Sequence, residues 1–378
     1  MKSAGNLPFQ QLTTHLPDGP ATIMRPPGVP QPGRCHEAIF AAARRVLAGR
    51  AFVVGPAAAP TALWAARSGA TVLHWTDSAA EAEAVAATFR ANHLPAPQGH
   101  VGPDCTCLEP GQCDMALVHL PRGRDLQGEY LRTAAAMVRE GAKVVFVGAR
   151  NEGVKSALAD AQEIYGRAGI VARKGGYHAG MAYRPPGEVQ LPTAEFRTYD
   201  IVVRGQPARL VSCTGAFAAD RLDAGAAALI AGMRIEPDVK VLDLGCGTGL
   251  VALEAARRGG RVEATDVSSR AVASARRTLS ANGYSRVTVH LCSGAATVPE
   301  DTIDVVVTNP PFHRGHDVNF EVSQLFVDEA ARVLKVGGRI YLVANAFLDY
   351  GRWLRSHFRD VEVAWQNKQF HVWSGRKF

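Results

Sequence analysis

Long uninterrupted apolar runs are absent from this 378-residue sequence. A helix that crosses a membrane needs roughly 18 or more such residues in succession, so no membrane span is expected. The first residues include Lys2, Gly5 and Pro8 and no apolar stretch, which is not the composition of a secretory signal. We therefore expect a cytoplasmic protein without a membrane partner, long enough to form two domains with separate cores.

Paired cysteine clusters are absent as well. The seven cysteines are odd in number and scattered along the chain, which indicates reduced thiols rather than a disulfide framework. Cys105, Cys107 and Cys113 lie near one another in the sequence, but no second cluster follows that would complete a zinc site. We therefore expect no metal.

A basic tail is the third missing feature. The formal net charge is +7, and the excess of Lys and Arg is shared by both halves of the chain. Such a charge is compatible with moderate affinity for a polyanion such as RNA, although many ordinary protein surfaces are equally basic. Charge alone therefore gives only weak support for an RNA partner.

A glycine-rich turn follows an apolar strand in the second half of the chain. Its sequence is Val241-Leu242-Asp243-Leu244-Gly245-Cys246-Gly247-Thr248-Gly249. Glycines permit a tight turn and close approach of a ligand, and the helix N-terminus that follows favours polar or anionic groups. The next strand ends at Asp266 and Val267, where a carboxylate can accept hydrogen bonds from ribose hydroxyls. The G-x-G-x-G spacing differs from the dinucleotide fingerprint, and Asp243 suits an ammonium group, although a nicotinamide cofactor is an alternative.

A second motif follows the apolar run Ile303–Val307 and reads Thr308-Asn309-Pro310-Pro311-Phe312. The two prolines stop the strand and fix the backbone, so the carbonyl of Pro310 is held where the sheet ends. The amide of Asn309 adds a second carbonyl acceptor, and Phe312 adds an aromatic ring. Two acceptors beside a ring suit a planar heterocycle with an exocyclic NH2 group. The alternative is an ordinary turn, because Pro and Asn are common turn residues.

The first half of the chain repeats the pattern of the second half. Residues 62–69 (ALWAARSG) match residues 252–259 (ALEAARRG), and both following strands end in Thr-Asp, at Asp77 and Asp266. Strands alternate with helices in both halves, which predicts two open parallel sheets. Ligands of such sheets bind beyond the carboxyl ends of the strands, where Asp266, Ser293 and Asn309 fall.

The first copy has lost the residues that carry the chemistry. Ala57 and Ala59 replace Gly247 and Gly249, and His119-Leu120 stand where Asn309-Pro310 stand. We interpret this copy as a structural or substrate-holding domain. Its exposed arginines are able to contact phosphates, but an ordinary solvated face explains them equally well.

These motifs together resemble the bacterial ribosomal RNA guanine-N2 methyltransferases. The resemblance rests on the glycine-rich turn, Asn-Pro-Pro-Phe-His, the duplication, the segment Val343–Tyr350, and a Phe-x-x-x-x-Leu-Asp-x-Gly motif before the cofactor strand. It implies an α/β fold of two tandem Rossmann-like class I methyltransferase domains, with a degenerate N-terminal copy and S-adenosylmethionine as cofactor. It also implies these cofactor-binding residues: Phe217, Asp223, Asp243, Gly245, Cys246, Gly247, Thr248, Gly249, Asp266, Val267, Ser293 and Asn309.

Composition predicts the domain boundaries. Residues 1–33 contain seven prolines and four glycines and are interpreted as an extended or partly ordered arm. Residues 34–184 are assigned to the degenerate domain, residues 185–196 to a linker, and residues 197–378 to the catalytic domain. We expect a monomer.

The resemblance predicts methylation of the N2 amine of a guanine, with 16S rRNA of the small subunit as the first choice. Asn309 and Pro310 are assigned as hydrogen-bond acceptors for the amine and Phe312 as the stacking ring. Alternatives are 23S rRNA, N6-adenine or a protein glutamine as the methyl acceptor. A further alternative is an RNA-binding assembly factor without turnover.

Overall fold

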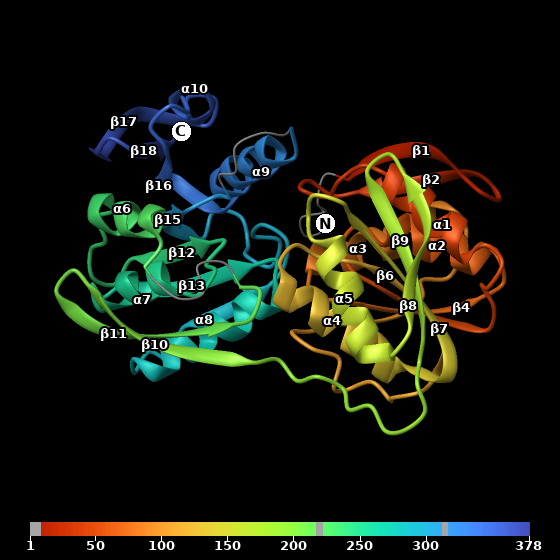
Figure 1. The fold of residues 1–378 in the computed structure, drawn as a ribbon. Helices are drawn as coiled ribbons and strands as arrows, with labels where there is room; N and C mark the ends of the chain where they lie inside the picture. The colour runs from red at the N-terminus through yellow and green to blue at the C-terminus, as the bar shows by residue number, and fades with distance from the viewer. Residues whose placement is uncertain (1–8, 217–221, 312–316) are drawn as a thin grey trace. The chain divides into compact units, whose positions relative to one another are not determined.

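The computed structural model describes residues 9–216, 222–311 and 317–378. It divides into two compact units, a first domain of residues Phe9–Ala194 and a second domain that includes Glu195–Phe378 (Figure 1). No helix in these described ranges is long and apolar enough to span a bilayer. The division falls inside the predicted linker, whose residues Val189 and Leu191 pack against the core of the first domain.

The first domain is built on a seven-stranded sheet with the order β5-β4-β3-β6-β7-β9-β8. Its elements are β1 (Gln10–Leu16), β2 (Gly19–Arg25), α1 (Arg34–Ala43), β3 (Arg50–Val54), α2 (Ala59–Arg67), β4 (Thr71–Thr76), α3 (Ala79–Ala91), β5 (Gln98–Val101), β6 (Cys113–His119), α4 (Arg124–Met137), β7 (Val138–Ala149), α5 (Val154–Tyr165), β8 (Ala168–Lys174) and β9 (Tyr177–Tyr183).

The second domain has a sheet of the same size, with the order β14-β13-β12-β15-β16-β18-β17. Its elements are β10 (Phe196–Val203), β11 (Gln206–Cys213), α6 (Ala224–Gly232), β12 (Lys240–Leu244), α7 (Leu250–Arg257), β13 (Arg261–Asp266), α8 (Ser269–Ala281), β14 (Thr288–Leu291), β15 (Ile303–Thr308), α9 (Asp317–Val333), β16 (Leu334–Asn345), α10 (Gly351–Leu354), β17 (Phe358–Gln366) and β18 (Phe370–Lys377).

The two sheets have the same strand order when matched strand by strand, which confirms the predicted tandem α/β fold. Five strands of each sheet are parallel, but the last two are not. β16 pairs antiparallel with β18, and β18 with β17; β7, β9 and β8 do the same in the first domain. The predicted open parallel sheet is therefore mixed at one edge, where the hairpins β17–β18 and β8–β9 bring the last strand back antiparallel to its neighbours.

The central strands are apolar throughout because both of their faces are buried. In β3, Ala51 and Val53 contribute to one core cluster, while Phe52 and Val54 contribute to the cluster on the opposite face. In β12, Val241 and Leu242 divide between two clusters in the same way. Successive side chains of each strand point to opposite faces of the sheet, so each central strand contributes to both hydrophobic cores of its domain.

The predicted N-terminal arm was wrong for residues 10–25. These residues form the antiparallel hairpin β1–β2, which is packed on α3. The backbone N–H groups of Thr22 and Met24 donate to Asn92 Oδ1 and Thr88 Oγ1, at 3.1 and 3.0 Å. Side chains at the C-terminal end of α3 therefore satisfy two backbone donors of the edge strand β2.

The second domain begins with an equivalent hairpin, β10–β11, which lies along α8 (Figure 1). The backbone N–H groups of Arg209 and Val211 donate to Asn282 Oδ1 and Thr278 Oγ1, both at 3.0 Å. An equivalent Thr-x-x-x-Asn pair, Thr88 and Asn92 or Thr278 and Asn282, thus holds the hairpin against a helix in each domain. The duplicated unit is a hairpin followed by an α/β sheet, longer than the sequence comparison indicated.

The turn after β3 has the same backbone conformation as the turn after β12, although Ala57 stands in place of Gly247. Ala57 has φ +56° and Gly247 has φ +54°, both in the left-handed region. The N–H of Ala57 donates to Glu81 Oε1 at 2.7 Å, a carboxylate of α3 that is buried. Burial raises the pKa of Glu81 from 4.5 to about 7; the charge of Asp77 adds to this effect and the Ala57 N–H opposes it.

Glu81 should therefore make the stability of the first domain depend on pH. Between pH 4.5 and 7 the folded state holds a proton that the unfolded state has lost, so stability falls as pH rises through this window. Glu81→Gln keeps an acceptor for the Ala57 N–H but does not titrate. The loss in unfolding free energy between low and neutral pH should therefore be smaller in the variant, by at most about 3 kcal/mol. Urea unfolding of both proteins at pH 5 and pH 7.5 measures the difference. Equal pH dependence in the two proteins would contradict this assignment.

Candidate functional site

The glycine-rich turn of the second domain opens onto free space. Gly245, Gly247 and Gly249 all have positive φ, a conformation that side chains disfavour. A Cβ on Gly245 would lie 2.7 Å from the ring of Phe326, and one on Gly249 would lie 2.9 Å from Cβ of Ala275. A Cβ on Gly247 would meet nothing within 4 Å. The turn is thus packed tightly on the protein at two glycines and exposed to a ligand at the third.

Asp266 lies beside this turn, at the carboxyl end of β13. Its Oδ2 accepts from the backbone N–H of Gly247 at 2.9 Å, and its Oδ1 accepts from that of Ser268 at 2.9 Å. The next residue, Val267, exposes 37% of its surface although it is apolar. A carboxylate and an exposed apolar side chain side by side suit a ribose joined to a flat base.

The neighbouring strand brings Ser293 to the same edge of the sheet. Asp266 pairs with Leu291 in the β13–β14 register, and the backbone N–H of Cys292 donates to the Asp266 carbonyl at 3.0 Å. Ser293 follows directly and is buried. The register therefore places its short polar side chain one strand away from Asp266, as predicted for strand ends in this kind of sheet.

Asp243 is buried at the end of β12, under the turn. Its Oδ2 accepts from the backbone N–H of Ala252 at 2.8 Å, which ties the strand to helix α7. Burial raises the pKa of Asp243 to about 7, the charge of Asp266 adds to the rise, and the Ala252 N–H opposes it. Asp243 therefore has a structural bond that the sequence did not reveal, beside its predicted contact with an ammonium group.

Asn309 follows β15, the strand next to β12. The pairing brings Thr308 opposite Leu244, and Thr308 Oγ1 donates to the Leu244 carbonyl at 2.8 Å. Asn309 Nδ2 donates to Asp223 Oδ2 at 2.9 Å. A carboxylate only accepts hydrogen bonds, so the amide nitrogen must face Asp223 and the amide oxygen is left to accept from a ligand.

Asp223 is itself fixed in place because it caps helix α6. Its Oδ2 accepts from the backbone N–H of Ala226 at 2.8 Å. Two residues along the chain, Gly225 leaves the space that the Asn309 side chain fills, since a Cβ there would lie 2.8 Å from Asn309 Oδ1. The Leu-Asp-x-Gly motif therefore both orients and accommodates the amide of Asn309.

The predicted site residues largely come together. Those at the carboxyl edge of the sheet are Asp243, Gly245, Cys246, Gly247, Thr248, Gly249, Asp266, Val267, Ser293, Asn309 and Pro310. Phe217 and Phe312 lie outside the described residues. Asp223, predicted to bind the cofactor, contacts Asn309. The steric role of Gly225 was not predicted, although the motif itself was visible in the sequence.

Comparison with known proteins decides the family. The family description "Methyltransferase small domain" matches residues 207–374. Ribosomal RNA small subunit methyltransferase C of Hahella chejuensis is 32% identical over 268 residues, which cover 69% of this chain and 77% of that protein. The chain therefore belongs to the ribosomal RNA small subunit methyltransferase C family. The namesake protein of Cronobacter sakazakii is 31% identical, over 69% of this chain and 75% of its own length.

A solved member of the family has the same two-domain fold. The structure described as the Thermus thermophilus 16S rRNA N2 G1207 methyltransferase in complex with AdoMet and guanosine matches with a TM-score of 0.79. It is 24% identical to this chain, and the match covers 98% of each chain. The predicted family, the class of enzyme and the tandem methyltransferase fold are therefore confirmed.

Gly225→Ala should reduce methyl transfer without a matching loss of stability. The added methyl group would crowd the amide of Asn309, and misplacement by about 1 Å can cost about 100-fold in rate. Alanine is the better helix former by about 1 kcal/mol, which offsets part of the crowding. Single-turnover rates and thermal unfolding measure the two effects. Gly169→Ala is the matched control because its Cβ would meet nothing within 4 Å; a rate equal to wild type for Gly225→Ala would contradict the steric role.

Proposed function

We propose that the second domain transfers the methyl group of S-adenosylmethionine to the exocyclic N2 amine of a guanine in 16S ribosomal RNA. The Asn309–Asp223 hydrogen bond carries the proposal, because it occupies the amide nitrogen and leaves the amide oxygen as the acceptor for a substrate amine. The names of the curated relatives favour the small ribosomal subunit over 23S rRNA. The Thermus protein is described as an N2 methyltransferase of G1207 with guanosine bound, which favours guanine over adenine or a protein glutamine.

The residues at the sheet edge fit S-adenosylmethionine. The open space beyond Gly247 admits a ligand against the backbone, and Asp266 and Val267 provide a carboxylate for ribose hydroxyls and an apolar surface for the adenine. Asp243 supplies negative charge for the ammonium group, and Ser293 is available for the polar edge of the base. The cofactor supplies a methyl group activated on a sulfonium ion.

The chain's own residues overcome the weak nucleophilicity of guanine N2. The lone pair of this amine is delocalised into the ring, so it must be made available by turning the nitrogen toward tetrahedral geometry. Asn309 Oδ1 and the Pro310 carbonyl accept the two N–H hydrogens and hold the lone pair in the direction of transfer. Asp223 fixes the Asn309 amide and polarises it, which strengthens the oxygen as an acceptor.

Proton removal needs no strong base in this arrangement. The methylated amine is acidic enough to lose its proton to solvent, so positioning and electrostatics account for the rate. Phe312 is assigned to stack on the guanine after the base has left its neighbours in the RNA. We also propose that the protein acts as a cytoplasmic monomer on ribosomal RNA or on a ribosomal particle.

The first domain is proposed to hold no cofactor. The turn at Ala57 is bonded to Glu81, and a cavity of only about 10 Å³ lies there, lined by residues of β2 and of the segment after it. That volume is about enough for one water molecule. The domain is thus a structural or RNA-holding copy of the catalytic one.

Asn309→Ala should affect the chemical step, and Asp266→Ala should affect cofactor binding. Loss of one preorganised hydrogen-bond partner costs roughly 100- to 1,000-fold in rate, so Asn309→Ala should slow single-turnover methylation by this factor.

Asp266→Ala removes an acceptor for ribose and should weaken S-adenosylmethionine binding at least about tenfold. Calorimetry and rapid-quench assays with 16S rRNA and 30S particles separate the two effects. Wild-type rates for Asn309→Ala would refute the acceptor role.

Cofactor stoichiometry tests the assignment of the domains. The protein should bind one S-adenosylmethionine per chain, and Asp77→Ala in the first domain should leave both stoichiometry and turnover unchanged. Equilibrium dialysis with labelled cofactor gives the count. Two cofactors per chain, or loss of turnover in a folded Asp77→Ala protein, would show that the first domain is a second active site.

A further inference from the structure

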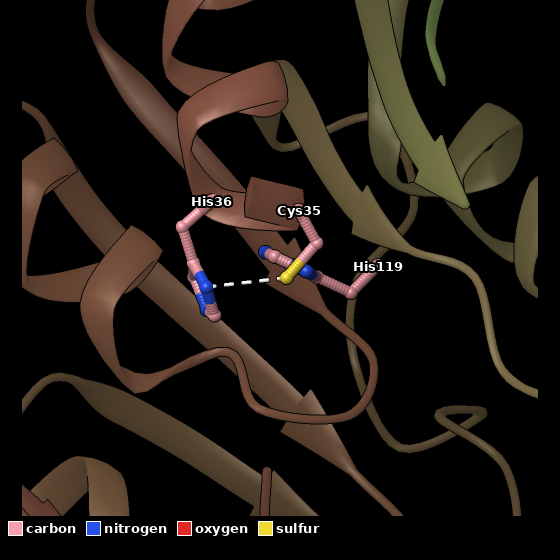
Figure 2. Close-up of side chains that lie close together, drawn as sticks. All are labelled: Cys35, His36 and His119. Atoms are coloured by element: carbon pink, nitrogen blue, oxygen red, sulfur yellow. Dashed lines mark hydrogen bonds between the residues drawn. The ribbon is translucent and has the colours of Figure 1, made fainter. Parts of the chain in front are cut away.

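Three metal-binding side chains meet in the first domain, at the carboxyl edge of its sheet. Cys35 and His36 begin helix α1, and His119 ends β6 (Figure 2). One donor atom from each residue lies within 4.8 Å of the other two, and Cys35 Sγ is 3.2 Å from His36 Nδ1. Among the described residues, this is the group of His, Cys, Asp or Glu whose geometry suits a metal ion. Cys105, Cys107 and Cys113 do not belong to it.

Each histidine uses its other ring nitrogen to hold the ring in place. His36 Nε2 lies 2.9 Å from the Ala57 carbonyl, which only accepts, so this nitrogen carries the proton and Nδ1 carries the lone pair. His119 Nε2 lies 2.8 Å from Thr61 Oγ1, so its Nδ1 is the ring nitrogen left for a metal ion. Metal-bound histidines have this arrangement, with an outer partner that fixes the tautomer and the ring direction.

The surroundings suit a metal ion as well. His36 and His119 are 3% and 4% exposed, and burial lowers the pKa of both imidazoles, which favours their neutral form. A cavity of about 400 Å³, lined by His36, Gly33 and Phe40 among others, lies beside one of the three residues. His36 Nδ1 also lies 3.2 Å from the Gly33 N–H, a long hydrogen bond that a metal bond would replace.

We propose that Cys35 Sγ, His36 Nδ1 and His119 Nδ1 bind one zinc ion. One thiolate and two imidazoles are donors that zinc prefers, and three protein donors leave the fourth tetrahedral position to water. The Zn–S bond forms as the thiol proton of Cys35 passes to solvent. The site lies where Asn309 and the start of α6 lie in the second domain, because His119 is the sequence counterpart of Asn309. A metal site thus replaces the lost catalytic residues and joins α1 to β6.

Metal content of the full-length protein tests the proposal. The chain is stripped with a chelator and dialysed against zinc, and bound metal is counted by mass spectrometry. Cobalt(II) is the spectroscopic probe, since a tetrahedral thiolate site gives intense visible bands and a sulfur-to-cobalt charge-transfer band. We expect one ion per chain and both cobalt signatures.

Variants locate the ion. Cys35→Ser should abolish the charge-transfer band and weaken zinc binding by more than about 100-fold, beyond what an outer partner contributes. Thr61→Val removes the partner of His119 and should weaken binding about tenfold. Cys107→Ser is the matched control, an exposed thiol of the same domain, and should bind like wild type. Circular dichroism checks that each variant is folded.

Two outcomes would overturn the proposal. The first is a stripped wild-type protein that takes up no stoichiometric zinc and gives no cobalt band; this result does not depend on any variant. The second is a folded Cys35→Ser protein that binds zinc as tightly as wild type, which would place the ion elsewhere. In either case, the Cys35–His36 contact is an ordinary, partly buried hydrogen bond.

Discussion

The parallel pairing of β12 with β15 is the constraint on which the site depends. It places a glycine-rich turn and Asn309 at one edge of the sheet although they lie far apart in the chain, and the Thr308–Leu244 hydrogen bond joins the two strand ends across a sequence separation of 64 residues. Helix α6 then completes the arrangement, because Asp223 holds the amide of Asn309. Each contact is short and local, but the sheet brings the contacting groups together.

The two domains show how one framework can keep its form and change its chemistry. Both have the same strand order, and in both a Thr-x-x-x-Asn pair holds a hairpin against a helix. Ala57 even retains the left-handed backbone of Gly247. What differs lies at the carboxyl edge of the sheet, where Glu81 takes the backbone bond that Asp266 makes in the second domain. Strand pairing and core packing preserve a fold, while a few strand-end residues determine what it binds.

Much of this was predictable because apolar strand patterns and strand-end motifs are properties of short segments. The turn from Gly245 to Gly249, the acid at Asp266 and the amide at Asn309 were all identified from their spacing. The first hairpin was missed because the seven prolines and four glycines of residues 1–33 were expected to break any periodicity. The repeated Thr88–Asn92 and Thr278–Asn282 spacing was the available signal for it.

The sequence by itself determined the family, the fold class and the strand ends that form the candidate site, because these depend on local pattern and on matching motifs. Tertiary structure alone decided which groups touch. It turned Asp223 toward Asn309, gave Gly225 a steric role and buried Asp243 against helix α7. It also brought Cys35 and His36 to His119, which lies on a distant strand in the sequence. The physical reason is that side-chain contacts between distant segments follow from strand register and helix packing, which no short stretch of sequence encodes.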